Sequence, residues 1–437
     1  MKVFLYLFCL MLGAASACGR AQASTAELTP QEAVALAIAS DPWLTASQHT
    51  QAALADEATA AATLPDPRMS LTAGNFPVDS FDIRQEPMTQ LAVGLSQVFP
   101  RGDTLALAAR RKLQLSRQQP LLRDNRRAKV AATVAQLWLD AYTAQESIRL
   151  IEADRALFDN LLDAARAGYA TAVAGVRQQD VIRAQLELTR LEDRLTTLRQ
   201  QQETAQTRLA EWIGSRGGSR LAAELPVDAP ASPVGIQASG QERYQRISHH
   251  PALLALDKQI AATATGVDLA RQKFKPEWGL NAQYGYRDSD LAGRDRADLF
   301  SVGLSVDLPI FTADRQDREV SAAIGHAEAI RTERQLLVRR LTAELETASR
   351  VLSRLDQRQA LYAEQLLPQM AELAESSLAA YNNDVGDFAE AVRARIGELN
   401  ARLEALVIAV QRQKTIAQIN YLLARPSSDA VQPAEDF

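Results

Sequence analysis

The sequence predicts a mainly α-helical protein with a transmembrane β-barrel portion and an internal duplication. Three observations predict this fold class. Long stretches have the apolar spacing of packed helices, four short segments alternate between apolar and polar residues, and the same landmarks occur twice along the chain. The composition agrees, because 47% of the 437 residues are hydrophobic while only 5% are aromatic.

The composition and the absence of catalytic motifs exclude several classes of function. The formal net charge is -5, so no basic excess indicates nucleic acid as a partner. No phosphate-binding loop, nucleophile elbow or zinc-protease motif is present, so the sequence predicts neither an enzyme nor a cofactor. His249 and His250 are adjacent, but neighbours on one helical turn point apart, and we therefore expect no metal site.

Residues 1–23 are predicted to be a secretory signal peptide. Lys2 precedes an apolar run from Val3 to Leu12, which is too short to span a membrane. Cleavage after Ala23 satisfies the rule of small residues at the cleavage site. The segment Ala15–Cys18 also has the form of a degenerate lipoprotein box, so Cys18 is a candidate for lipidation. Both interpretations predict export from the cytoplasm.

Residues 24–213 and 241–425 are predicted to be two structural repeats. Landmarks recur at one offset of 209 positions, which relates Asp41-Pro42 to His250-Pro251, Pro67 to Pro276, Val93–Ser96 to Val302–Ser305 and Pro100 to Pro309. Chance rarely keeps one register across four landmarks. Residues 214–240 are rich in Gly, Ser, Pro and Ala and are predicted to be a connector, and residues 426–437 a disordered tail.

Each repeat is predicted to contain a helix, two strands and two long helices, in this order. The first helix covers residues 30–64 in one repeat and about 241–274 in the other. The strand pattern is clearest where Phe300, Val302 and Leu304 alternate with small or polar residues. The strands are expected at 69–73, 90–96, 278–287 and 300–308, each part of a segment of about ten residues, which is the length a tilted strand needs to cross a bilayer.

The long helices are predicted over about residues 104–167 and 313–379. Only Pro120 and Pro368 interrupt their patterns, and at about 1.5 Å per residue such a helix reaches roughly 100 Å. The helices that return along residues 181–212 and 392–410 carry apolar residues in steps of three and four, which is typical of helix-to-helix packing.

Four strands cannot close a barrel by themselves, and an open edge in lipid would leave backbone groups unpaired at a cost of several kcal/mol each. Several subunits must therefore share one barrel. A soluble sandwich is the alternative for isolated strands, but the long helices and the export signal favour a barrel.

With these elements in place, nearly the whole mature chain resembles the TolC family of outer-membrane factors. The marks are Leu28–Ala33 followed by Asp41-Pro42, the strand end Val302–Phe311, and Leu366–Pro368 followed by Ala380-Tyr381. The resemblance implies a homotrimer with a twelve-stranded outer-membrane barrel and a long periplasmic helical barrel. It also implies two protein partners, a periplasmic adaptor (membrane fusion protein) and an inner-membrane RND-type pump, besides outer-membrane lipid.

Further segments are similar to the heavy-metal branch of this family, the cobalt-zinc-cadmium and copper-silver efflux systems. They are Leu64–Pro67, Asn75–Asp79, Glu86–Thr89 and Phe99–Gly102. The resemblance implies passive conduction of heavy-metal cations. A duct for drug efflux or type I protein secretion and, from another class, an exported coiled-coil structural protein remain alternatives.

The family closes its periplasmic end where helices turn and acidic residues surround the lumen. By position, Asp180 corresponds to the acidic site of the first repeat, and Asp384, Asp387 and Glu390 lie at the turn of the second. Arg393 stands where a second acid is expected. Threefold symmetry would turn such side chains into rings that attract cations. The alternative is that acids at a helix start merely interact with its dipole.

Overall fold

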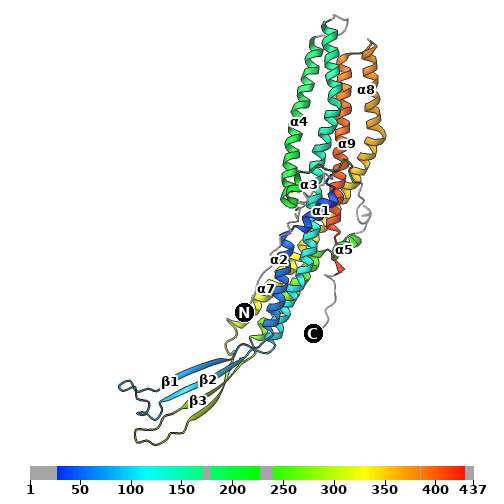
Figure 1. The fold of residues 1–437 in the computed structure, drawn as a ribbon. Helices are drawn as coiled ribbons and strands as arrows, with labels where there is room; N and C mark the ends of the chain where they lie inside the picture. Colours follow the sequence, from blue (N-terminus) through cyan, green and yellow to red (C-terminus); the bar gives the residue numbers. More distant parts are fainter. Residues whose placement is uncertain (1–26, 171–177, 227–239, 384, 429–437) are drawn as a thin grey trace, which may run out of the picture.

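The computed structural model describes residues 27–170, 178–226, 240–383 and 385–428. The molecule is long and narrow, with the strands at one end and two helical hairpins at the other (Figure 1).

The first half contains α1 (Pro30–Ala39), α2 (Pro42–Ala61), β1 (Arg68–Gly74), β2 (Gln90–Phe99), α3 (Thr104–Ala170) and α4 (Gln178–Ile213). The second half contains the 3-10 helix η1 (Gly214–Gly218), α5 (Gly240–Ser248), α6 (Pro251–Gln272), β3 (Glu277–Tyr286), β4 (Leu299–Asp307), α7 (Gln316–Leu361), the π-helical turn η2 (Tyr362–Leu366), α8 (Leu367–Asn382) and α9 (Phe388–Leu422). The predicted fold class, mainly helical with four strands, is confirmed.

The first predicted helix of each repeat is in fact two helices, so this part of the prediction was wrong. Residues before a proline disfavour helical backbone, and Asp41 and His250, which precede Pro42 and Pro251, are both extended. Their side chains then cap the next helix. Asp41 accepts a hydrogen bond of 3.1 Å from Trp43 N, and His250 Nδ1 accepts one of 3.2 Å from Ala252 N.

The strands form one antiparallel sheet in the order β1-β2-β3-β4. The central pair joins the two halves of the chain, because Leu91 of β2 lies opposite Tyr286 of β3 and Phe99 lies opposite Trp278. β1 has only seven residues, fewer than the predicted ten. Pro67 directly precedes the strand, and Asn75 turns the chain out of it with a φ of 59°.

The helix α3 is continuous over 67 residues, about 100 Å at 1.5 Å per residue, even though Pro120 lies within it. The equivalent stretch of the second half, predicted as one helix, is interrupted by η2 between α7 and α8. Pro368 follows this turn at the start of α8. Proline lacks an N–H group and its ring crowds the preceding turn, so the local widening to a π turn has a steric cause.

The core lies between the helices rather than in one compact centre. Trp138 of α3 is completely buried, and its indole Nε1 donates a hydrogen bond of 2.9 Å to the carbonyl of Leu28. Towards the helical end, buried apolar side chains of α3, α4 and α9 pack together, among them Phe158, Leu195 and Leu399. In the parts of the chain that the structure describes, no helix has both the length and the apolar character needed to cross a membrane.

Candidate channel wall and helical tip

The four strands place their large apolar side chains on one face of the sheet. Leu71 lies opposite Val93, Val93 opposite Tyr284, and Tyr284 opposite Phe300, so one apolar row crosses all four strands. This face is exposed, with 73% of Leu71 and 71% of Phe300 accessible. The same face carries Met69, Leu91, Leu95, Trp278, Leu280, Tyr286, Val302 and Leu304, which are also exposed. An exposed apolar surface of this extent indicates contact with lipid or with another protein.

The opposite face of the sheet carries small and polar residues. Ser70, Gly94, Gln283 and Ser301 form a row across the strands. A Cβ atom at Gly94 would lie 2.6 Å from the Ser70 hydroxyl, so glycine gives the neighbouring side chain room on this face. A sheet with one apolar and one polar face suits a boundary between lipid and water.

Both edges of the sheet are unpaired in this subunit. Among the described residues, β1 and β4 each have one strand neighbour only. Such edges are templates for pairing with another chain. Because the strands alternate in direction, β4 of one copy and β1 of another would continue the antiparallel order.

A group of charged side chains connects the sheet to the helices. Arg101, two residues after β2, forms an ion pair with Asp307 at the end of β4 and donates a 2.9 Å hydrogen bond to the carbonyl of Lys273. Lys275 forms an ion pair of 3.0 Å with Asp103. The sequence did not predict these contacts between the two halves of the chain. Gly102, which has a φ of 47°, does belong to the segment Phe99–Gly102 that the sequence analysis singled out.

The described gate candidates of the second repeat, Asp387, Glu390 and Arg393, lie at the end of the α8/α9 hairpin, far from the strands (Figure 1). Asp387 caps α9 by accepting a 3.2 Å hydrogen bond from Ala389 N, which agrees with the helix-start alternative for this acid. Glu390 and Arg393 are exposed on the first turns of α9, and Arg393 Nε donates a 3.1 Å hydrogen bond to the Ala389 carbonyl.

The other predicted site residues are placed differently. Asp180 lies in the first turn of α4 and is only 4% exposed, so in this subunit its carboxylate does not face open solvent. Asp384 and Cys18 lie outside the described residues, as do the predicted signal peptide and most of the predicted tail. The structure therefore places Asp387, Glu390 and Arg393 together at the start of α9.

The adjacent histidines do not form a metal site. His250 is fully buried, its Nε2 lies 3.1 Å from the Tyr421 carbonyl, and burial lowers its pKa. His249 is exposed and bonds instead to the Gln245 carbonyl. Within the described ranges, no group of three or more His, Cys, Asp or Glu side chains is placed to hold a metal ion.

Arg126 forms an interhelical cluster that sequence reasoning missed. Its Nε donates a 2.7 Å hydrogen bond to Asp41, and its guanidinium lies 5.9 Å from the ring centre of Trp43 and 5.5 Å from that of Trp212. The hydrogen bond from Arg126 is the main reason that the pKa of Asp41 is lowered. The Asp-Pro motif pointed to Asp41, but nothing pointed to a partner 85 positions away.

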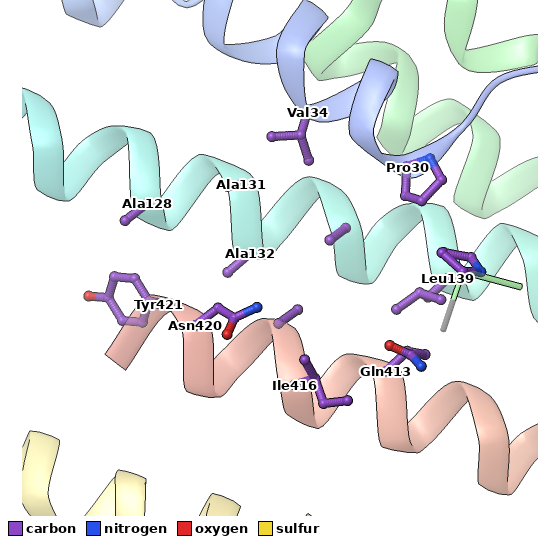
Figure 2. Close-up of a pocket in the computed structure, with 13 residues that line it drawn as sticks. Pro30, Val34, Ala128, Ala131, Ala132, Leu139, Gln413, Ile416, Asn420 and Tyr421 are labelled. Carbon is purple, nitrogen blue, oxygen red and sulfur yellow. The ribbon is translucent and has the colours of Figure 1, made fainter. Parts of the chain in front are cut away.

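A groove of about 230 Å³ lies between α1, α3 and α9. Figure 2 shows Ala128, Ala131 and Ala132 along α3 on one side, and Ile416 and Asn420 of α9 on the other. Its lining contains no acidic or basic side chain. The groove therefore offers no group of reactive side chains.

Comparison with known proteins agrees with this description. Residues 243–425 match the family model described as outer membrane efflux protein. The fold of the chain is similar to crystal structures of CusC (15% identity, TM-score 0.73, covering 91% of this chain and 92% of that one). It is also similar to the CmeC outer membrane channel of Campylobacter jejuni (12%, 0.75, 92% and 87%) and to the open state of the MtrE outer membrane channel of Neisseria gonorrhoeae (17%, 0.71, 91% and 89%). No curated protein matches the sequence.

The second repeat thus carries the sequence signature of outer membrane efflux proteins, and almost the whole chain has the fold of outer-membrane channels. The predicted resemblance to outer-membrane factors is confirmed at this level. The matching family and structures are channels and not enzymes, in agreement with the sequence.

Proposed function

We propose that this chain is one subunit of a homotrimeric outer-membrane channel that passively carries substrates from a periplasmic adaptor and an inner-membrane RND-type pump to the exterior. One observation carries the proposal. A sheet with an exposed apolar face and two open edges continues into a helix of about 100 Å.

Three copies of the sheet give twelve strands, and pairing β4 of each copy with β1 of the next satisfies every open edge. In such a barrel the face with Leu71 and Phe300 contacts lipid, and the face with Ser70 and Ser301 lines the lumen. The alternative of a soluble coiled-coil protein gives no role to an exposed apolar sheet.

The helical part suits the same assembly. At the end away from the strands, α4, α3, α9 and α8 lie side by side in this order, so α4 and α8 are the outer helices of the subunit (Figure 1). Three such layers, joined α8 to α4, form a closed tube of helices. This tube would lie in the periplasm, where an adaptor can reach its end.

For the cargo, we propose heavy-metal cations, on the basis of the likeness of residues 64–67, 75–79, 86–89 and 99–102 to the heavy-metal branch. No metal-ligand group occurs in the described part of the chain, so the pump would select the ion. Drugs and secreted polypeptides are the other cargo classes.

Two experiments test these proposals separately. The purified mature protein should be a trimer by light scattering in detergent and should form conducting pores in planar bilayers; a water-soluble monomer would rule out the channel. Deleting the protein in a strain without redundant channels should lower tolerance to zinc, cobalt, cadmium, copper or silver. Unchanged tolerance to all five would leave the channel in place and remove heavy metals as its cargo.

We further propose that Glu390 and Arg393, with Asp384 and Asp387, surround the lumen at the periplasmic end. The exposure of Glu390 and Arg393 at the hairpin end supports this assignment. The first-repeat candidate, Asp180, is buried in the isolated subunit, so exposure does not support the same assignment for it.

A further inference from the structure

The two loops at the strand end of the molecule carry exposed apolar side chains that the proposed function does not use. The first loop (residues 75–89) joins β1 to β2, and the second loop (residues 287–298) joins β3 to β4. We propose that Val78 and Phe81 in the first loop of one subunit pack against Leu291 in the second loop of the neighbouring copy. This inference rests on the proposed ring of subunits and identifies a contact surface at its outer mouth.

The first loop has a defined conformation. Phe81 has a φ of 54°, which is an unusual and strained conformation for a bulky residue. Local hydrogen bonds hold this backbone, since Phe81 N donates to the Pro77 carbonyl (2.9 Å) and Asp82 N donates to the Ser80 hydroxyl (3.2 Å). The exposed ring of Phe81 is therefore presented by an ordered turn.

The later part of the first loop is occupied by contacts within its own chain. Arg296 of the second loop donates hydrogen bonds to the carbonyls of Glu86 (2.9 Å) and Arg84 (3.0 Å). Arg84 also forms an ion pair of 3.2 Å with Asp288. These bonds follow from the sheet order, because β2 lies next to β3 and each strand brings its loop beside the other.

The earlier part of the first loop follows β1, which is an edge strand, and among the described residues no hydrogen bond or ion pair joins it to the second loop. Here Val78 is 85% exposed and Phe81 is 69% exposed. In the second loop, Leu291 is 72% exposed at a turn that is closed by an Asp290–Arg294 ion pair of 2.8 Å. Burying these three side chains against each other would remove their apolar surface from water, which favours the contact.

The ring geometry brings these surfaces together. When β4 of one copy pairs with β1 of the next, the two strands lie about 4.8 Å apart, so the second loop of one copy lies beside the first loop of the other. The contact uses different surfaces on the two partners, so in the proposed closed ring it repeats at every subunit boundary. A second copy of this chain is the occupant that this arrangement specifies.

The test uses the full-length protein in which Cys9 and Cys18 are replaced by serine, with the double substitution Phe81→Cys and Leu291→Cys. Cys9 and Cys18 are the two cysteines of the sequence, so after their replacement the introduced pair supplies the only thiols. After oxidation, the double variant should migrate mainly as a covalent trimer on a denaturing gel. Each single variant should not, because one cysteine per subunit can link at most two chains.

The pair Met88→Cys and Leu291→Cys is the matched control. Met88 is also exposed (57%) and lies in the same loop, but next to β2, so any link to Leu291 should stay within one chain. If Phe81→Cys fails to assemble, Val78→Cys with Leu291→Cys makes the same test.

The mass of the native protein in detergent distinguishes a failure of the loop contact from a failure of the proposed ring. A detergent-solubilised trimer by light scattering whose double variant gives no covalent trimer would overturn the loop contact and leave the channel intact; loops embedded in lipid would give this result. A native monomer would overturn the ring itself, and with it the proposed function.

Discussion

Arg126 donates a 2.7 Å hydrogen bond to Asp41, and this ion pair holds the start of α2 against the middle of α3. In the second half, His250 occupies the equivalent position and caps α6 in the same way. Its second contact is different, because Nε2 bonds to the Tyr421 carbonyl at the end of α9. Asp41 and His250 therefore both cap a helix. Asp41 is held by an ion pair with Arg126, whereas His250 is held by a hydrogen bond to a backbone carbonyl.

Breaking the first anchor should destabilise the protein. In Asp41→Asn the short polar side chain still caps α2, but the charged partner of Arg126 is lost, and hydrogen bonds to charged groups contribute about 1.5–3 kcal/mol. We expect a loss of this size in thermal or denaturant unfolding. Lys112→Gln, which removes an exposed pair with Glu57, is the matched control and should cost less than about 1 kcal/mol. Equal losses in both variants would contradict a special role for Asp41.

The same pair predicts an acid-dependent loss of stability. Because the pKa of Asp41 is lowered, mainly by its hydrogen bond with Arg126, the folded state favours the carboxylate. The contribution is present above the unfolded-state pKa of about 3.9 and is lost as the pH falls through the folded value. The stability difference between the parent protein and Asp41→Asn should therefore shrink below about pH 4. A difference that stays constant from pH 7 to 3 would exclude this linkage.

His250 should make the protein less stable in mildly acidic solution. Burial lowers its pKa, so the unfolded chain binds a proton at a higher pH than the folded chain. The stabilisation is therefore complete above the unfolded-state pKa of about 6.5 and decreases as the pH falls below it. We expect a lower melting temperature at pH 5 than at pH 7.5, and a smaller difference in His250→Asn. His249→Asn is the control, because this exposed side chain bonds only within its own helical turn, and it should keep the full difference.

A charged substitution should lower assembly on the apolar face of β4 and be tolerated on the polar face. Leu304→Arg places a cation on the apolar face, where charges near the middle of a membrane cost about 2–4 kcal/mol per subunit. Ser301→Arg places the same charge on the polar face and should be tolerated. The yield of membrane-inserted trimer, measured by resistance to extraction and by native mass, distinguishes them. Equal yields would argue against a lipid-facing apolar surface.

Neutralising the helical tip should change ion flow. Glu390→Gln removes an exposed acid from the proposed lumen and should raise single-channel conductance or lower cation preference in planar bilayers. Asp180→Asn changes a buried residue and should act mainly on stability. The control is Glu372→Gln, because Glu372 is an exposed acid of α8 that lies farther from the hairpin end. Unchanged conductance and selectivity in Glu390→Gln would remove this residue from the gate.

Much of the fold was predictable because periodic patterns show directly which face of a helix or strand is apolar. The alternation at Phe300, Val302 and Leu304 identified β4 and its apolar face, and the matched landmarks placed β2 and β4 in equivalent positions. The helix break at Asp41 was not predicted, although Asp41-Pro42 was noticed, because the pattern of apolar residues continues across it.

The site was less predictable, because its parts depend on partners that are distant in sequence. Neither the contact of Arg126 with Asp41 nor that of Arg296 with the first loop follows from local spacing. Likewise, the sequence does not show whether an acid at a helix start, such as the buried Asp180, is exposed or buried.

The pairing of β2 with β3 has a consequence for the ancestry of the chain. This pair, which joins the two repeats, continues the same antiparallel order as the pairs within each repeat. A ring of six single-repeat ancestors would therefore have had the same strand sequence around its circumference as the proposed ring of three chains. Fusing two copies lowers the rotational symmetry from sixfold to threefold, and this frees alternate positions to diverge, as Asp41 and His250 have done.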